Sequence, residues 1–506
     1  MSKKIFANEE YFEKIEKNPV LCLVLIGIGA IIIRLIFFQN ETIFNSDNLL
    51  YFQYAIDISK FGESPIELLN DGWSRVLAIF FRFVESNNFL VYMNLQSYLT
   101  IIFSTLTIIP LYIFARKFVN TSLAIIATIF FVFEPRIIQN SLIGITDSLF
   151  VLLIVTSLAL ITQKNKYLIS ISFISVGFAA IVRSEGLFLI PALCIMFFLQ
   201  NKISKKNIFF CMIFLFMATL ILLPFSIERI ENTGNDYLVG RIIISSSSFS
   251  EQTQNEPNQI FLKIADSIFV LGGFLARLMI PYLIIFVPIG LIIFLKKNDN
   301  HRLLLLVPGF FLILPSLYAY TIPALDGRYL FTILPIICII GVFSCQKYLQ
   351  NPKYKKLILC IIISIIIISS MVFLLYKNQE KDNQNEFLKL ADIINKNTDI
   401  ILYSKTPIMS YLEPAKLMEL KEFPVSSSHY SENSILMIDN YSNINDFFTN
   451  LEKQGITHIV IDEEIDNSQI IREILENYEE NNRLMKIFDS KENGFNYKIK
   501  IFEIKY

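Results

Sequence analysis

The sequence predicts a helical membrane protein with about eleven transmembrane segments, followed by a small α/β domain on the outer side of the membrane. Hydrophobic residues make up 54% of the 506-residue chain, above the roughly 45–50% of soluble proteins. They fall into runs of roughly 16–25 residues, a length that crosses a hydrocarbon core of about 30 Å as a helix. From about Lys377 onward the chain becomes hydrophilic, and strand-like runs alternate with helical ones.

The apolar runs predict helices rather than barrel strands, because barrel strands would alternate between apolar and polar residues. The first run has no small-residue cleavage site, so we expect it to be a retained span and not a signal peptide. The predicted spans are residues 20–38, 90–114, 120–134, 147–162, 167–182, 186–200, 207–225, 276–295, 302–320, 328–346 and 357–376.

The distribution of lysine predicts that the N-terminus is cytoplasmic. Residues 167–182 and 186–200 are separated only by "RSEG" and would make a helix of about 50 Å if they were one span, so we count two. The inner loops then carry sixteen lysines and two arginines, which agrees with the positive-inside rule. The C-terminal region falls on the outer side.

Arginines and acids gather on the predicted outer side. Topology requires only positive charge, so the choice of arginine indicates planar recognition of phosphate or carboxylate. Any one of these residues could be a helix-end charge that reaches the lipid headgroups, but the whole set favours a charged external cavity. The arginines are Arg75, Arg82, Arg136, Arg183, Arg229, Arg241, Arg277 and Arg328, and the acids are Asp47, Asp57, Asp71, Glu134, Asp147, Glu185 and Asp326.

The outer loops contain further expected elements. In the first loop, residues 39–88, "DNLLYFQYAIDISKFG" and "WSRVLAIFFRFVE" have helical periodicity but are short for spanning, so we expect them to lie on the membrane surface. The loop at 226–275 includes "SSSSFSEQTQNEPNQ", which has the composition of a flexible segment and could be a lid or a linker. We take residues 1–376 as the transmembrane domain.

Residues 377–506 show an α/β pattern. The strand-like runs "DIILYS", "SILMID", "THIVID" and "YKIKIFEI" alternate with helical segments near 384–397, 444–454 and 468–480. This domain contains no glycine-rich phosphate loop, so it is not expected to be a nucleotide-binding enzyme domain. The net charge of −1 identifies no partner, and we expect none among nucleic acids. The six cysteines and three histidines lack the spacing of a disulfide framework or metal site.

Three short motifs, together with this architecture, resemble the GT-C superfamily of integral-membrane glycosyltransferases. "NSDNLLYFQYA" is similar to a first-loop pattern of an acid followed by Tyr and Ala, "AAIVRSEGLFLIP" to an R-x-E-G-L…P element, and "DGRYLFTILPII" to the R-Y…P opening of a late span. The chain most resembles the group that uses polyprenyl- or dolichyl-phosphate sugars, such as the protein O-mannosyltransferases and aminoarabinose transferases.

The resemblance has three departures. Asp47 is followed by Asn48 where the protein O-mannosyltransferases usually have Asp-Glu, so one carboxylate remains to act. "DGWSR" stands where many relatives have "HPP". The Trp-Trp-Asp element of the oligosaccharyltransferases is missing from this chain, whose one tryptophan is Trp73. Transfer of a preassembled oligosaccharide is therefore disfavoured.

The resemblance implies transfer of a monosaccharide, a hexose with mannose as one candidate, from a polyprenyl- or dolichyl-phosphate carrier. The acceptor would be a hydroxyl on a protein, lipid or glycan at the outer face of the plasma membrane. A carboxylate must take the proton of that hydroxyl. Asp47, close to headgroup level, is the predicted base, and Tyr51 is a predicted substrate-binding residue.

Positive charge is needed opposite the leaving phosphate. The predicted residues are Arg183 with Glu185, and Arg328 with Asp326. No cofactor is required, although two converging acids could hold a divalent metal that bridges to phosphate, and this is left open. The further candidates are Arg34, Arg136, Glu134 and Asp147.

Each of these residues has a structural alternative. Asp47 could be the N-cap of a helix at 48–60, the Arg183–Glu185 pair could be a salt-bridged turn, and residues 326–328 could form a tight turn. Arg34 lies inside the first span and is expected either to have a partner or to reach the interface.

Two other classes of protein compete with an enzyme. A transporter or flippase of lipid-linked sugars would favour broken helices, polar residues at mid-membrane and repeated halves. The charges instead collect on one face, and no internal repeat is found. The third class is an adhesion or assembly protein. Residues 377–506 would then make the functional contacts and the membrane part would serve only as an anchor, but an anchor does not need eleven spans.

Overall fold

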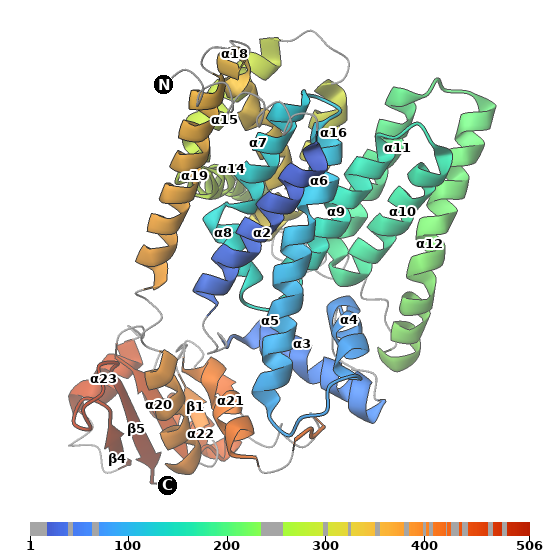
Figure 1. Cartoon of the computed structure of the whole chain (residues 1–506). Helices are drawn as coiled ribbons and strands as arrows, with labels where there is room; N and C mark the ends of the chain where they lie inside the picture. Colours follow the sequence, from blue (N-terminus) through green and yellow to red (C-terminus); the bar gives the residue numbers. More distant parts are fainter. Residues whose placement is uncertain are drawn as a thin grey trace. The chain divides into compact units, whose positions relative to one another are not determined.

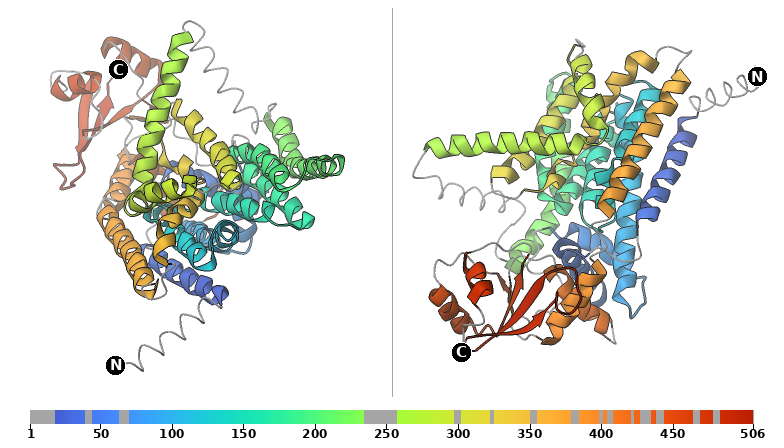
Figure 2. Two further views of the ribbon diagram at one scale, coloured as in Figure 1. Left: turned by 90° about the horizontal axis from the view of Figure 1, so that it is seen from above. Right: turned by 90° about the vertical axis from the view of Figure 1, so that its left-hand side faces the viewer.

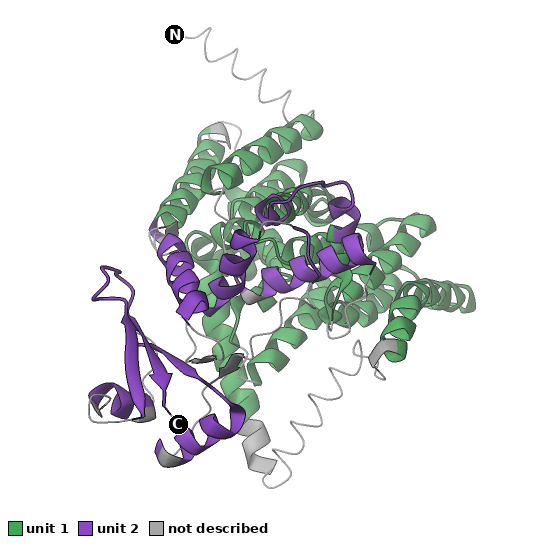
Figure 3. Ribbon diagram, turned by 90° about the horizontal axis from the view of Figure 1, so that it is seen from below, with its two compact units in different colours: residues 1–41, 64–77, 94–375 green, residues 42–63, 78–93, 376–506 purple. Residues whose placement is uncertain are grey.

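The computed structural model divides the chain into two compact units (Figure 3). Unit 1 comprises residues 1–41, 64–77 and 94–375, and unit 2 comprises residues 42–63, 78–93 and 376–506. Each unit is described by itself. The residues described are 18–38, 44–62, 70–233, 257–296, 302–321, 325–349, 355–378, 384–397, 401–403, 408–420, 423–426, 435–437, 444–463, 469–477 and 483–505.

Unit 1 is helical (Figure 1). Its helices, of which α4, α5 and α19 extend into unit 2, are α2 (Pro19–Phe37), α4 (Gly72–Phe81), α5 (Phe89–Leu106), α6 (Ile108–Ala115), α7 (Thr121–Val132), α8 (Pro135–Ser141), α9 (Asp147–Ile161), α10 (Lys166–Val182), η2 (Ser184–Phe188), α11 (Leu189–Gln200), α12 (Lys205–Thr233), α14 (Pro257–Met279), α15 (Leu283–Lys296), α16 (Leu303–Thr321), η4 (Gly327–Leu330), α17 (Leu334–Gly341), η5 (Val342–Cys345), α18 (Gln346–Leu349) and α19 (Lys355–Asn378).

The predicted spans are largely helical, but some of the helices are long enough to cross a membrane and others are shorter. Within the described residues, five helices are long and apolar enough to cross a membrane, or up to seven if each of two bent pairs is one span. Other predicted spans are shorter apolar helices, such as α9, α10 and η2 with α11. The count of eleven spans and their orientation therefore stay predictions.

The shorter helices of unit 1 pack against one another and against longer helices. Helix α10 packs between α9 and α12, and α11 contacts both α9 and α16 (Figures 1 and 2). The "RSEG" sequence forms the start of η2, whose Gly186 lies so close to α10 that an added Cβ would be 2.7 Å from the Ala180 nitrogen. Residues 167–182 and 186–200 are thus two packed helices, as the sequence indicates.

Two helix pairs in unit 1 are bent at a break. Helices α7 and α8 meet at 55°, and the apolar part of α14 meets α15 at 113°. Pro135 opens α8, and Pro281 lies between Met279 and Leu283, so neither break can be closed by a continuous ladder of helical hydrogen bonds. The predicted span over 276–295 therefore contains a break at residues 280–282, and its crossing of the membrane as one span stays a prediction.

The expected outer loop at 226–275 is also shorter than predicted. Helix α12 continues to Thr233, and α14 begins at Pro257, so helix occupies both ends of that range. Much of the "SSSSFSEQTQNEPNQ" stretch, and the lid considered for it, lie outside the described residues.

Unit 2 contains a five-stranded sheet in the order β2-β1-β3-β5-β4. Strands β1 (Ile401–Tyr403), β2 (Ile435–Met437) and β3 (His458–Asp462) are parallel, and β5 (Ile499–Ile504) pairs antiparallel with β3 and β4 (Leu484–Asp489). The helices are α20 (Gln384–Asn397), α21 (Met409–Glu419), α22 (Ile444–Gln454) and α23 (Gln469–Asn477). The predicted α/β pattern is found, although α21 and β4 were not anticipated.

Unit 2 also contains parts of the predicted first outer loop. Helix α3 (Ser46–Ile56) continues into a single π-helical turn, η1 (Asp57–Phe61), and both cluster with the C-terminal segments. The sequence predicts helices here, and α3 and α4 are helical. It gives no indication that residues 42–63 and 78–93 would group with residues 376–506.

Candidate active site

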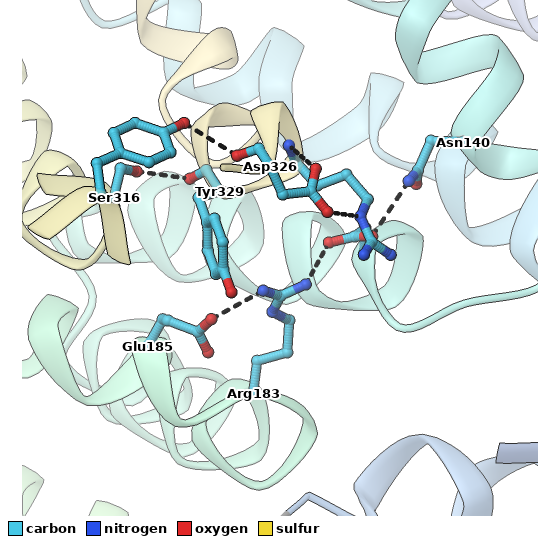
Figure 4. Close-up of polar contacts among 9 residues, drawn as sticks. Asn140, Arg183, Glu185, Ser316, Asp326 and Tyr329 are labelled. Atoms are coloured by element: carbon cyan, nitrogen blue, oxygen red, sulfur yellow. Dashed lines mark hydrogen bonds and ion pairs between the residues drawn. The ribbon is translucent and has the colours of Figure 1, made fainter. Parts of the chain in front are cut away.

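An arginine held between two carboxylates forms the first part of the site. The Arg183 guanidinium donates to Asp147 Oδ1 at 2.6 Å and to Glu185 Oε1 at 2.8 Å (Figure 4). Asn140 donates to the other oxygen of Asp147 at 3.1 Å. Asp147 is 3% exposed, so this pairing satisfies a carboxylate that water does not reach. The predicted partner of Arg183, Glu185, is found, and Asp147 joins it.

The second part is the turn that begins η4. Asp326 caps η4 by accepting from the Arg328 backbone N–H at 2.8 Å, and its other oxygen accepts from Arg328 Nε at 2.5 Å. Tyr320 donates to the Asp326 carbonyl at 2.9 Å, and Ser316 donates to that of Tyr329. Figure 4 shows that these contacts fix the turn against α16. The sequence allows two interpretations of residues 326–328, either a tight turn or a charged pair that binds phosphate. In the structure Asp326 both caps the turn and pairs with Arg328, so the two alternatives do not exclude each other.

The third part lies at the break between α7 and α8. Glu134 caps α8 by accepting from the Ile137 backbone N–H at 2.9 Å, and it accepts from Arg136 at 3.2 Å. The same Arg136 nitrogen donates to the Ile280 carbonyl at the α14–α15 break. Glu134 is 1% exposed, whereas Arg136 is 24% exposed. Glu134 thus holds the arginine, and the arginine is the group that faces outward.

Three arginines converge on a cavity of about 360 Å³, which we call the arginine pocket. Arg136, Arg277 and Arg328 line it, and Asp326 is the carboxylate among its lining residues. No carboxylate in the described part of the chain pairs with Arg277, whose guanidinium lies 5.5 Å from the Phe274 ring centroid. The excess of arginine over acid makes this pocket suited to an anion.

The arginine pocket adjoins the Arg183 group. Arg328 and Phe331 line both this pocket and a small cavity beside Asp147, Arg183 and Glu185. The Arg183 guanidinium also lies 5.5 Å from the Tyr329 ring centroid, within range of a cation–π contact. The predicted residues of unit 1 thus form one continuous polar region.

Asp47 and Tyr51, the remaining predicted site residues, belong to unit 2. Helix α3 begins at Ser46, and its N-cap is Asn45, which forms a reciprocal capping box with Asn48. Asp47 therefore lies in the first turn, and the alternative that it is the cap is wrong. A carboxylate in the first turn is stabilised by the helix dipole. Tyr51 follows four residues later, on the same face of the helix.

Arg34 does not reach the interface. It is fully buried and donates to Ser141 Oγ at 3.0 Å, to Ser104 Oγ at 2.9 Å and to the Val132 carbonyl at 3.2 Å. The expectation that Arg34 has partners is therefore confirmed, although these partners are neutral. The alternative that its side chain extends to the interface is wrong, because the side chain is buried. Val132 ends α7 and Ser141 ends α8, so Arg34 ties together the bent pair that carries Arg136.

Two residues of the pocket were missed by sequence reasoning as individual site candidates. Arg277 was counted only as one of the outer arginines. Asn140 was overlooked because it carries no charge. It follows Arg136 by four residues on α8, and this spacing, which puts both side chains on one helix face, could have indicated that Asn140 lines the same pocket.

The described residues contain no group of three His, Cys, Asp or Glu side chains that could hold a metal ion. Both Asp147 oxygens already accept hydrogen bonds, from Arg183 and Asn140. In this part of the chain, arginine supplies the positive charge at the pocket.

Comparisons with known proteins agree with a membrane fold. The model of a family of predicted membrane proteins, DUF2079, matches residues 96–396. No curated protein matches the chain.

Among solved structures, the chain is similar to the oligosaccharyltransferase of Archaeoglobus fulgidus in complex with zinc and sulfate. The TM-score is 0.57 at 13% identity, over 87% of this chain and 68% of that one. It is also similar to ArnT from Cupriavidus metallidurans bound to undecaprenyl phosphate, with a TM-score of 0.54 at 10% identity, over 95% of this chain and 97% of that one. At these identities the likeness shows the fold, and both structures are GT-C glycosyltransferases. The chain therefore belongs to the DUF2079 family of predicted membrane proteins, and its fold is similar to that of these GT-C glycosyltransferases.

Proposed function

We propose that the chain is a membrane glycosyltransferase that takes a sugar from a lipid-linked phosphate donor. The observation that carries the proposal is the arginine pocket, where Arg136, Arg277 and Arg328 face one carboxylate, Asp326, in a cavity of about 360 Å³. A cavity of that size is within the usual range of small-molecule sites. The GT-C fold adds support, since one structural neighbour was crystallised with undecaprenyl phosphate.

The arginines would act on the leaving phosphate. As the bond between the anomeric carbon and the phosphate oxygen breaks, its electron pair stays on that oxygen and negative charge grows there. Arg136 and Arg328 are held in place by Glu134 and Asp326. Donors fixed in advance stabilise the developing charge without having to reorganise.

Asp47 would act on the acceptor. The acceptor oxygen forms the new bond to the anomeric carbon, and its proton passes to the Asp47 carboxylate. Asp47 is partly exposed at the start of α3. We further propose a monosaccharide (a hexose such as mannose), a polyprenyl- or dolichyl-phosphate carrier and an acceptor on protein, lipid or glycan. The reaction would take place at the outer face of the plasma membrane. The part of a divalent metal in this reaction is left open, since one structural neighbour was crystallised with zinc.

The pocket assignment can be tested by donor binding. In purified full-length protein, Arg277→Ala should weaken binding of a polyprenyl phosphate roughly 10- to 100-fold, because a hydrogen bond to a charged group contributes about 1.5–3 kcal/mol. Arg302→Ala is the matched control, since Arg302 donates to the Leu295 carbonyl and does not line the pocket. Equal affinity in the two variants would contradict the assignment.

A lipid-linked-sugar flippase is the second candidate, and two observations favour it. Two helix pairs are bent at breaks, and Arg34 is buried within a span; both features are typical of transporters. Liposomes containing the protein and a labelled lipid-phosphate sugar separate the two functions. A flippase moves the intact lipid to the opposite leaflet without acceptor, whereas a transferase releases the lipid phosphate only when acceptor is present.

A further inference from the structure

The helix that carries Asp47 has one buried face. Leu49, Phe52 and Ile56 of α3 are at most 4% exposed, whereas Asp47 is partly exposed. At about 100° per residue, the directions of these three side chains lie roughly 140–200° around the helix from Asp47. Whatever packs against the buried face therefore determines the direction of the carboxylate on the opposite face.

The C-terminal part of unit 2 contributes to that packing. The Phe52 ring stacks on the Phe423 ring, with centroids 5.9 Å apart and an interplanar angle of 14°. Phe423 is 4% exposed and lies more than 370 residues later in the chain. Its ring also contacts Phe89 and Tyr92, with centroids 6.4 and 5.5 Å away. One C-terminal side chain thus joins α3 to the start of α5, which follows the predicted first outer loop.

A second contact supports the same end of α3. Phe44, just before the Asn45 cap, meets Tyr411 of α21 edge-on, with centroids 5.7 Å apart. Together, Phe44, Phe52, Phe81, Phe89, Tyr92, Tyr411 and Phe423 form an aromatic cluster within unit 2. Aromatic pairs contribute beyond the burial of their area and have preferred geometries. The cluster therefore fixes both the position of α3 and its rotation.

We propose that Phe423 is a positioning residue for Asp47 and that the C-terminal residues Tyr411 and Phe423 take part in the reaction by holding α3. The proposal rests on the proposed function, since it needs Asp47 to act on the acceptor. Residues 377–506 could otherwise bind the acceptor or cover the site. The proposal gives them a different role, which is to hold the helix that carries Asp47. The Phe423 ring meets α3 at Phe52, so its effect on Asp47 passes through Phe52 and the helix.

The test compares two conservative changes in the full-length protein. Phe423→Leu keeps an apolar side chain but loses the stacked ring. Phe447→Leu makes the same change on α22, in the hydrophobic core between helices and sheet, where Phe447 is fully buried. Misplacing a catalytic group by about 1 Å can cost roughly 100-fold in rate. We expect Phe423→Leu to lower kcat about 10- to 100-fold at unchanged donor KM, and Phe447→Leu to keep kcat in the folded fraction.

Two further readouts separate positioning from a general loss of folding. Phe52→Leu should also lower kcat, and the loss in the double variant Phe52→Leu/Phe423→Leu should be clearly smaller than the product of the two single losses, because the Phe52–Phe423 contact is already lost in each single variant. Amide hydrogen exchange should rise in residues 46–56 of Phe423→Leu, while residues 184–200 of unit 1 stay as protected as in wild type.

The outcomes distinguish this inference from the proposed function. If Asp47→Asn is inactive and Phe423→Leu has wild-type kcat, the inference is overturned and the proposed function stands. The inference also fails if the defects of Phe52→Leu and Phe423→Leu multiply in the double variant. Full activity of Asp47→Asn would overturn both together.

Discussion

At the scale of single residues, the site is organised by arginines that carboxylates hold in place. Arg183 is bound on two sides, by Asp147 and Glu185, and Arg328 is bound by the residue that caps its own turn. The motifs "RSEG" and "DGR" predicted these local pairs, since the partners are two residues apart. They could not predict that Asp147, a separate candidate, pairs with Arg183, because it is 36 residues away and meets Arg183 only through helix packing.

Removing Arg183 should destabilise unit 1. Arg183→Ala leaves Asp147, 3% exposed, without its ion-pair partner, and breaking a buried pair costs about 3–5 kcal/mol. We expect a clear fall in the melting temperature in detergent. Lys396→Ala is the control, because Lys396 is 56% exposed and pairs at the surface. Equal melting temperatures in the two variants would show that the Arg183–Asp147 pair contributes no stability.

Glu413 should make the stability of unit 2 depend on pH. Burial raises the pKa of its carboxyl to about 7, and Lys416 opposes the rise only in part. The folded state then holds the proton more tightly than the unfolded state. The contribution of Glu413 to the free energy of unfolding is therefore complete below about pH 4.5 and is lost as pH rises through about 7.

The measurement is hydrogen exchange in residues 409–419 of the full-length protein between pH 5 and 8, corrected for the intrinsic pH dependence of exchange. Wild-type protection should fall over this range, and Glu413→Gln, which cannot ionise, should show a smaller fall. The same fall in both proteins would exclude Glu413 as its source.

At the scale of elements, close backbone contacts and helix breaks determine where the site residues lie. Pro135 and the α14–α15 break could be suspected from the sequence, yet the bends that bring Arg136 and Arg277 to one pocket could not. The bend directions depend on tertiary partners such as Arg34, whose hydrogen bonds join the ends of α7 and α8. Strand β4 was missed because it is an edge strand, half exposed and interrupted by a register shift at Lys486.

Gly290 tests one such close contact. A Cβ at this position of α15 would lie 2.2 Å from the Ile340 carbonyl oxygen of α17, so both backbones must move. We expect Gly290→Ala to cost about 3 kcal/mol or more through overpacking. Gly272→Ala in α14 meets no atom within 4 Å and gains helix propensity. Detergent chromatography after heating should show loss of the monodisperse peak in the first variant and not in the second.

At the scale of the whole molecule, the sequence predicted a membrane protein with the GT-C fold, and the structural comparisons agree. Composition and run length carry the membrane prediction because they need no tertiary contact. The grouping of residues 42–63 with the C-terminal segments could not be predicted, because its contacts, such as Phe52 with Phe423, join distant parts of the chain. The number of spans depends on helix lengths that packing alters.

The predicted orientation can be checked with epitope tags in intact cells. The sixteen lysines of the predicted inner loops place these loops in the cytoplasm. An antibody should therefore reach a tag after Lys164 only once the membrane is permeabilised. A tag after Lys491 should be reached without permeabilisation. The reverse pattern would put residues 377–506 in the cytoplasm and remove the extracytoplasmic site.

Sugar transfer by the purified, reconstituted protein tests the central claim most directly. The assay uses radiolabelled polyprenyl-phosphate sugars as donors, cell-envelope extract as acceptor, and wild type beside Asp47→Asn, with folding checked by detergent chromatography. The account predicts that wild type labels the acceptor and that folded Asp47→Asn is roughly 100- to 10,000-fold slower, the usual contribution of a general base. Equal transfer by the two proteins would contradict the role of Asp47, and no transfer from any donor would contradict the glycosyltransferase itself.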